Sequence, residues 1–425
     1  MRLFLPLIPE TPVKVSKTIS SITVIAACAL LSLVLLANVS GKESLSNEPD
    51  LASYVGSESC RNCHVEHYGG WQETVHGKMI LPAERYEADN PVRKAFEDEI
   101  TADSPRIRLN YPGQGEGPPA ESWEDVDYVV GGNWKARYVK QVEGEGHRFY
   151  DAQYNITGTQ AGKMTAYSET RNNEDRCLGC HSTGFDYDLS KSLDRSATDY
   201  SFESMTAELG IGCEACHGPG EKHINNPGKE GGIINPADYT VAEQTEFCGS
   251  CHGRNMGHRT IEGHQDPIGF SIGEYARDYT KIQSLVRPYD GDWEYDPSRF
   301  WDHGAGISHR MQYNDFEQGP HWGKISCTDC HNPHGVVPNS RPEGTVMIGG
   351  QPTVVMPASG TSALKWPADE NFCYNCHSTD QQNYTIEAFM PMTSRSSAGA
   401  LAEQRSHTFW PRGMGNPHPS VDMSR

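Results

Sequence analysis

The pattern Cys-x-x-Cys-His occurs six times in this chain of 425 residues and uses 12 of its 13 cysteines. One copy lies in the stretch KISCTDCHNPHG at 324–335, where a second histidine, His334, follows His331 by three residues. Two cysteines at this spacing can bond to the two vinyl groups of a haem, and the histidine after them can then bind the iron from one face. This stretch can therefore hold one haem and reach towards another.

Two other kinds of site also use Cys-x-x-Cys pairs, namely redox-active dithiols and zinc sites. Zinc sites do not require a histidine directly after the second cysteine, and a thioredoxin-like motif would not recur six times. We therefore interpret the six copies as c-type haem attachment sites and number them in chain order as haem motifs one to six. The predicted attachment residues are Cys60, Cys63, Cys177, Cys180, Cys213, Cys216, Cys248, Cys251, Cys327, Cys330, Cys373 and Cys376. The predicted iron ligands that follow them are His64, His181, His217, His252, His331 and His377.

The composition indicates a chain that cannot build a large aliphatic core. Hydrophobic residues make up 36% of it, the mean hydropathy is −0.63, and there are 42 glycines and 27 prolines. Six haems would supply apolar faces to bury, so we predict a mostly α fold with extensive loops and a small β hairpin region, organised around stacked haems. The net charge of −20 argues against nucleic acid as a partner and favours solubility or a basic docking partner.

The N-terminal residues indicate export from the cytoplasm. Residues 19–39 carry no charge over 21 positions, which is long enough to span a membrane. Positive charges precede this run in residues 1–18, so we predict a cytoplasmic N-terminus, a single membrane anchor and a remainder outside the cytoplasm. The alternative is a signal peptide cleaved near Ser40 or Gly41. An anchor places the protein on the periplasmic side of the bacterial inner membrane, whereas cleavage would release it into the periplasm.

The rest of the chain divides into a polar linker at 40–53, a haem domain at 54–412 and a tail at 413–425. Within the haem domain, apolar residues at helical spacing predict a helix at 64–78. β-branched and aromatic residues around turn signals predict an antiparallel hairpin formed by 128–139 and 147–156. The hairpin lies between haem motifs one and two, which is the only gap with room for a haem-free element.

Each iron has a second axial position, and histidines outside the motifs are the candidates for it. Six of the 18 histidines belong to the motifs, which leaves 12 for six irons. Histidine on both faces suits low-potential electron transfer, whereas methionine would raise the potential. The chain also has 12 methionines, but none stands at a position that indicates ligation.

Several segments resemble the multihaem cytochrome c-552/c-554-like family, in the same order along the chain from about 54 to 412. They are YVGSESCRNCH, YVVGGNWKARYV, GCEACHGPGEKH, QYNDFEQGPHWGKISCTDCHNPHG and RSHTFWP. The resemblance implies that histidines at these places are second iron ligands, namely His76, His223, His321, His334 and His407. A sixth would come from His258, His264, His303 or His309. The chain departs from longer relatives before Met390, where no Cys-x-x-Cys-His is present, and this indicates a lost haem.

We expect an electron carrier whose partners are redox proteins: a quinol-oxidising module, a soluble cytochrome or a terminal reductase. One alternative is an oxidoreductase that acts on a small nitrogen or sulfur compound at a five-coordinate haem, which needs acid or base groups beside the iron. His147, Tyr150 and Arg137 could lie near such an iron, but nothing singles them out, so no catalytic residue is predicted. Another alternative is a structural subunit of an extended haem wire.

Overall fold

A computed structural model describes parts of the chain from residue 51 onwards. The described residues are 51–101, 107–112, 117–131, 134–156, 160–174, 177–229, 231–253, 255–257, 280–282, 300, 305–335, 345–348, 351–354, 373, 376–377, 390, 392–397, 400–405, 407 and 409. All of them belong to the second of two compact units, Glu48–Arg425. None of the helices in these ranges is long and apolar enough to cross a membrane. The predicted anchor at 19–39 and the segment before it lie outside the described residues.

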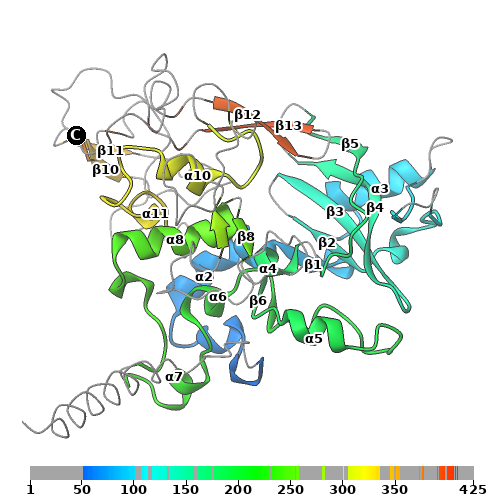
Figure 1. The fold of residues 1–425 in the computed structure, drawn as a ribbon, viewed down its shortest axis with the longest axis horizontal. Coiled ribbons are helices and arrows are strands. Elements are labelled where there is room, and N and C mark those ends of the chain that lie inside the picture. Colours follow the sequence, from blue (N-terminus) through cyan, green and yellow to red (C-terminus); the bar gives the residue numbers. More distant parts are fainter. Residues whose placement is uncertain are drawn as a thin grey trace, which may run out of the picture. The chain divides into compact units, whose positions relative to one another are not determined.

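A five-stranded antiparallel sheet fills the gap between haem motifs one and two (Figure 1). Its strands pair in chain order and are β1 (Ile80–Pro82), β2 (Tyr128–Val130), β3 (Lys135–Val142), β4 (Gly146–Asn155) and β5 (Lys163–Ala166). The predicted hairpin is confirmed as β3 and β4, which pair from Val142 and Gly146 at the turn to Lys135 and Asn155. The β region is larger than predicted, because the short strands β1 and β5 carry too few residues to show the alternation typical of a strand.

The two faces of this sheet pack against different partners, because side chains alternate along a strand. On one face, Tyr138 of β3 and Tyr150 of β4 contact Phe96 of helix α3 (Pro91–Thr101) with ring centres 4.6 and 5.6 Å apart. On the other face, Phe149 packs in a core that includes Leu178 of helix α4 (Leu178–His181) and the haem-motif residue Cys177. The sheet thus separates a haem-free core from haem motif two.

The helices within the described residues are short. Besides α3 and α4 they are α2 (Val65–Gln72), α5 (Tyr187–Ser192), α6 (Cys213–His217), α7 (Glu221–Asn225), α8 (Val241–His252), α10 (Gln312–Glu317) and α11 (Cys327–Cys330). Single 3-10 turns are η1 (Leu51–Ser53), η2 (Ser57–Cys60), η3 (His76–Lys78), η4 (Ala83–Arg85), η5 (Trp123–Asp125) and η6 (Pro236–Asp238). Four further strand pairs are β6 (Ser182–Thr183) with β7 (Glu208–Leu209), β8 (Asn255–Gly257) with β9 (Thr280–Ile282), β10 (Thr345–Ile348) with β11 (Gln351–Val354), and β12 (Met392–Ser397) with β13 (Ala400–Arg405).

The helix predicted at 64–78 is broken into α2 and η3. The Thr74 hydroxyl donates to the Trp71 carbonyl oxygen at 2.7 Å, and the Thr74 amide donates to the same oxygen at 2.9 Å. Both bonds close a tight turn in place of the next helical turn, because a threonine side chain can compete for backbone carbonyls. His76 therefore lies on η3 and not on the helix that carries His67.

Helix α8 shows how a haem motif is held in place. Its first turn is closed by a capping box, in which the Thr240 hydroxyl accepts from the Glu243 amide and the Glu243 carboxylate accepts from the Thr240 amide. Its last residues are haem motif four. Within that motif a Cβ on Gly249 would lie 2.3 Å from the Tyr313 ring of α10, so only glycine permits this contact between the two helices.

Candidate haem-binding sites

Each haem motif that the structure describes in full forms about one helical turn. The amide of the motif histidine donates to the carbonyl of the first cysteine at 2.9 Å in motifs one, five and six. Residues three and four positions apart lie on the same face of a helix, so the two thiols and the imidazole point to one side. None of the twelve motif cysteines forms a disulfide in the part of the chain that the structure describes. The local backbone therefore presents the three groups that haem attachment requires.

The structure brings five motif histidines next to five of the histidines from distant segments. The ring centres are 6.2 Å apart for His64 and His223, 6.1 Å for His217 and His334, 6.1 Å for His252 and His76, 6.3 Å for His331 and His407, and 5.9 Å for His377 and His321. Two imidazoles on opposite sides of one metal ion have ring centres roughly 6 Å apart, because the metal–nitrogen bond is about 2 Å and the ring centre lies about 1 Å beyond the nitrogen. All five separations leave room for one iron.

His67 also lies near this set, but local helix geometry explains its position. It follows His64 by three residues on α2, and their ring centres are 6.3 Å apart because such residues are neighbours on a helix surface. Its ring meets the His334 ring edge-on at 4.5 Å, which is too close for an iron to lie between them. His67 is therefore a neighbour of the third site. It does not form a further pair with a motif histidine from a distant segment.

The apolar surface beside the first site fits a large flat cofactor. In the described part of the chain, the large apolar side chains that stand out as exposed are Val65 and Ile224, at 65% and 43%. Val65 directly follows His64, and Ile224 directly follows His223. Both exposed apolar residues therefore flank the two histidines of the first site in the sequence.

Five of these imidazoles are in the protonation state that binds iron, because protein atoms surround each of them even though part of each residue's surface is open to solvent. Burial lowers the pKa of His252, His321, His331 and His334 to about 4, and it also lowers the pKa of His76. These rings are therefore neutral at pH 7, and a neutral imidazole has the free nitrogen lone pair that a metal needs. His217 is oriented as well, since its Nδ1 lies 2.8 Å from the Ile234 carbonyl oxygen and can donate to it, leaving Nε2 to face a metal.

Haem motif two has a different environment. Arg310 donates from Nη1 to the Cys180 sulfur at 3.5 Å, and the neighbouring His309 ring lies 5.8 Å from the Trp134 ring. His309 is the one candidate for the sixth distal ligand that falls inside the described ranges, whereas His258, His264 and His303 lie outside them. The choice among these four stays a prediction.

Contacts between motifs define the order of the sites. The Cys60 and Cys213 side chains touch, and this contact lowers the pKa of the Cys213 thiol to about 7, so motifs one and three are neighbours. Burial and the nearby thiols of Cys248 and Cys251 raise the pKa of Cys216 to about 12, so motif four lies beside motif three.

The same kind of contact extends to the other motifs. Cys248 of motif four interacts with Cys327 of motif five, and buried Met390 packs against Cys330 of motif five and Cys373 of motif six. Arg310, which bonds to motif two, also lies near His252 of motif four. The motifs thus lie near one another in the pairs one and three, three and four, four and five, and five and six, while Arg310 lies near both motif two and motif four.

Comparisons with known proteins agree with these observations. The family model for cytochrome c554 and c-prime matches residues 140–218, which contain haem motifs two and three. The multiheme cytochrome MtrA of Shewanella baltica is 26% identical over 206 residues, which are 48% of this chain and 52% of that protein. The chain therefore spans about half the length of this curated relative.

Solved structures give a matching fold. The outer cell wall cytochrome OcwA is similar with a TM-score of 0.52 and 20% identity, over 84% of this chain and 80% of that one. The octaheme sulfite reductase MccA of Wolinella succinogenes has a TM-score of only 0.38 at 15% identity, over 84% of this chain and 58% of that one, which is too low to indicate a common fold. The chain belongs to the multihaem c-type cytochromes. It therefore binds c-type haems covalently, and transfer of electrons is the function of this class.

In this multihaem cytochrome the three residues considered near an open iron do not form one site. Tyr150 lies on the haem-free face of the sheet, where its hydroxyl donates to the Asp125 carbonyl at 3.0 Å. Arg137 stacks over the Tyr167 ring at 4.4 Å, and His147 is completely buried at the other end of β4. Their grouping as catalytic candidates is not supported by their positions.

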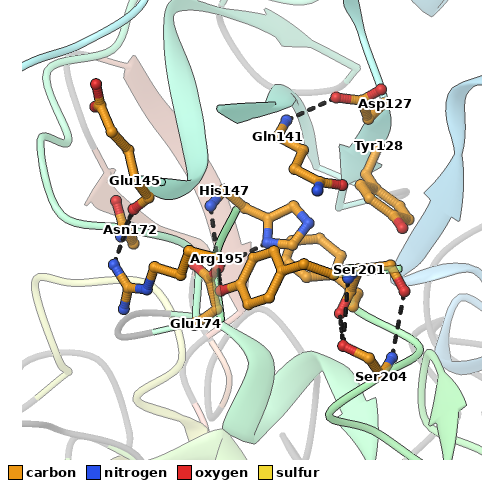
Figure 2. A network of polar contacts seen from close by, with 12 residues as sticks. Asp127, Tyr128, Gln141, Glu145, His147, Asn172, Glu174, Arg195, Ser201 and Ser204 are labelled. Atoms are coloured by element: carbon orange, nitrogen blue, oxygen red, sulfur yellow. Dashed lines mark hydrogen bonds and ion pairs between the residues drawn. The ribbon is translucent and has the colours of Figure 1, made fainter. Parts of the chain in front are cut away.

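His147 instead belongs to a buried polar network beside haem motif two (Figure 2). Its Nδ1 lies 2.6 Å from Oε1 of Glu174, which is 1% exposed, and the Tyr200 hydroxyl donates to the same oxygen at 2.6 Å. The preceding residue, Asn173, donates its amide to the His147 carbonyl at 2.9 Å, and the Asn173 carbonyl accepts from the Cys177 amide at 2.8 Å. The network thus fastens the start of motif two to β4, and sequence patterns gave no sign of Glu174.

Two other residues that position predicted ligands also lacked a sequence signal. Asp315 is fully buried, and its carboxylate accepts from the amides of Gly306 at 2.8 Å and His407 at 3.1 Å. Gly335 has φ +88, and a Cβ there would lie 2.0 Å from the Gly70 carbonyl oxygen of α2. Only glycine lets the loop that carries His334 approach α2 so closely.

Proposed function

We propose that this cytochrome binds six c-type haems and carries electrons along them between redox partners outside the cytoplasm. The observation that carries the proposal is the set of five ring pairs about 6 Å apart, each of which joins a motif histidine to a histidine from a distant segment. Local structure would bring residues of one helix together, but it would not bring five such distant pairs to one common spacing.

In this proposal the motif histidine binds each iron from one side and a distant histidine binds it from the other. The distal ligands are His223 for site one, His334 for site three, His76 for site four, His407 for site five and His321 for site six. Site two takes its distal ligand from His258, His264, His303 or His309. Each haem, when bound, supplies an iron that cycles between the ferric and ferrous states.

The protein's own contribution is to hold the sites close together. Motifs one and three, and motifs four and five, interact directly through cysteine side chains, Cys216 of motif three lies near the motif-four thiols, and Met390 bridges motifs five and six, which supports a continuous row. Histidine on both axial positions favours low reduction potentials. Such a row suits transfer through the molecule better than chemistry on a substrate.

We place the protein on the outer face of the bacterial inner membrane, attached by residues 19–39, with release into the periplasm as the alternative. The uncharged N-terminal run supports the attachment, and the similarity to an outer cell wall cytochrome supports only a location outside the cytoplasm. A quinol-oxidising module would deliver electrons, and a soluble cytochrome or terminal reductase would accept them. The net charge of −20 favours a partner with a basic docking surface.

Rapid mixing of the reduced protein with nitrite or hydroxylamine separates a carrier from an enzyme. We expect slow reoxidation that rises linearly with the concentration of the added compound, because both axial positions of the irons are filled. The haem absorbance in a stopped-flow instrument gives the rate. Fast reoxidation that saturates with concentration would instead favour an oxidoreductase with an open iron, and sulfite serves as the sulfur compound in a parallel measurement.

A further inference from the structure

Glu214 stands between the two cysteines of haem motif three and is buried, with 2% of its surface exposed. Its carboxylate accepts hydrogen bonds from three backbone amides. Oε1 accepts from Gly220 at 2.6 Å and from Val55 at 3.0 Å, while Oε2 accepts from Gly56 at 2.7 Å and again from Val55 at 3.1 Å. One side chain therefore joins segments that are nearly 160 positions apart in the chain.

Both of the segments that Glu214 holds lead to the first haem site. Val55 and Gly56 come directly before η2, which ends at Cys60, the first attachment residue of motif one. Gly220 precedes α7, which carries His223. The His223 ring faces the His64 ring at 6.2 Å, so the two segments supply opposite sides of the same site.

The fit around the carboxylate is close. A Cβ on Gly220 would lie 3.1 Å from Oε1 of Glu214 and 3.0 Å from the Val55 side chain, so a glycine here leaves little spare room. An ionised carboxylate can only accept hydrogen bonds, and all three of its neighbouring backbone amides are donors. Every hydrogen bond around Glu214 therefore has a donor and an acceptor. Hydrogen bonds to an ionised acceptor are roughly twice as strong as neutral ones, which suits a single residue that must hold two segments.

We propose that Glu214 is the positioning residue for both axial sides of the first iron, although it belongs to the motif that attaches the third haem. The inference rests on the proposed ligation of the first iron by His64 and His223. It makes the geometry of the first site depend on the correct folding of motif three. The contact between Cys60 and Cys213 places the two sites side by side, so a single carboxylate can serve this purpose.

Glu208 offers a matched comparison because it holds only one of these segments. Its Oε2 accepts from the Ser57 amide at 3.1 Å and from the Ser57 hydroxyl at 2.6 Å. Ser57 in turn accepts from the Cys213 amide at 2.8 Å. Glu208 is thus a half-buried carboxylate at the same junction, and its hydrogen bonds go to Ser57 rather than to Gly220 or α7.

The test compares Glu214→Gln with Glu208→Gln in the full-length holoprotein. Whichever way the new amide turns in Glu214→Gln, its NH₂ group faces an amide of Val55 together with one of Gly220 or Gly56. We expect one iron per chain to change from low-spin to high-spin in electron paramagnetic resonance, and added imidazole to restore the low-spin signal. Glu208→Gln should keep the wild-type spin state, because the bond to Gly220 is intact.

His223→Ala distinguishes a failure of this inference from a failure of the proposed ligation. If His223→Ala leaves every iron low-spin, the ligation itself is wrong. A second outcome concerns Glu214 alone. If His223→Ala gives one high-spin iron but Glu214→Gln has the same spectrum as the wild type or as Glu208→Gln, the proposed role of Glu214 is wrong. Should Glu214→Gln fail to accumulate with its haems, Glu214→Asp replaces it. The shorter side chain keeps the charge but cannot reach both segments, so it should give the same high-spin iron, and an unchanged spin state overturns the proposal.

Discussion

Replacing His334 by alanine should turn one iron of this cytochrome high-spin while all six haems stay attached. The His334 ring lies 6.1 Å from the His217 ring, and the two ring planes are only 16° apart. The substitution removes one proposed axial ligand and leaves Cys213, Cys216 and His217 in place, so the proposed thioether bonds and proximal ligand should survive. Electron paramagnetic resonance should report one new high-spin ferric signal per chain, and the potential of that iron should change because axial ligation sets it.

His67→Ala is the matched control for this prediction. The His67 ring touches the His334 ring at 4.5 Å but has no motif histidine of its own across a suitable gap. This control should leave all irons low-spin. If His334→Ala shows an unchanged low-spin spectrum, the double variant His67→Ala/His334→Ala decides whether His67 has moved in as a substitute. A low-spin spectrum in the double variant would rule out His334 as the ligand of the third iron.

Replacing Glu174 by alanine should lower the free energy of unfolding by about 4 kcal/mol, since it leaves several buried donors unpaired. The His147 amide at 3.0 Å, His147 Nδ1 and the Tyr200 hydroxyl all meet the single oxygen Oε1 of Glu174. The Asn173 backbone bonds to His147 and Cys177 are then left as the remaining link between motif two and β4. Guanidinium unfolding, followed by far-ultraviolet circular dichroism, measures the change.

The dependence of this difference on pH provides a second check. Burial raises the pKa of Glu174, but hydrogen bonds from His147 and Tyr200 and the His147 charge outweigh it, and the net pKa is below the ordinary 4.5. A lowered folded-state pKa stabilises the protein above the unfolded pKa and ceases to do so as the pH falls through the folded value. The difference between wild type and Glu174→Ala should thus be full above pH 4.5 and shrink in stronger acid. Glu143→Gln, in the exposed β3–β4 turn, should change stability by less than about 0.5 kcal/mol, and an equal effect of both substitutions would contradict the role of the network.

The sequence alone located the haem motifs because their chemistry is local. Two cysteines and a histidine must share one helical turn, so their spacing is visible in any copy, and six copies exclude most other interpretations. The hairpin of β3 and β4 was also visible, since its strands are long enough to show β-branched and aromatic residues around a turn. The histidines implied by family resemblance are those that the structure brings to five of the motifs.

Long-range contacts could not be predicted in the same way. In the sequence, Glu214 is one of the two variable residues between the cysteines of a haem motif. Only the folded chain shows that its carboxylate holds Val55 and Gly220 together. The pairing of His147 with Glu174 joins residues 27 positions apart on separate segments, and neither lies in a recognisable pattern. The order of the sites depends on contacts such as Cys60 with Cys213, which no spacing along the chain encodes.

The most direct test of the central claim is quantitative electron paramagnetic resonance of the fully oxidised protein, with the haem content per chain measured on the same sample. The claim is that histidines on both sides hold at least five of six irons. It predicts six haems per chain and at least five low-spin ferric irons, with no more than one high-spin. Two or more high-spin irons per chain, or fewer than six haems in the mature protein, would contradict it.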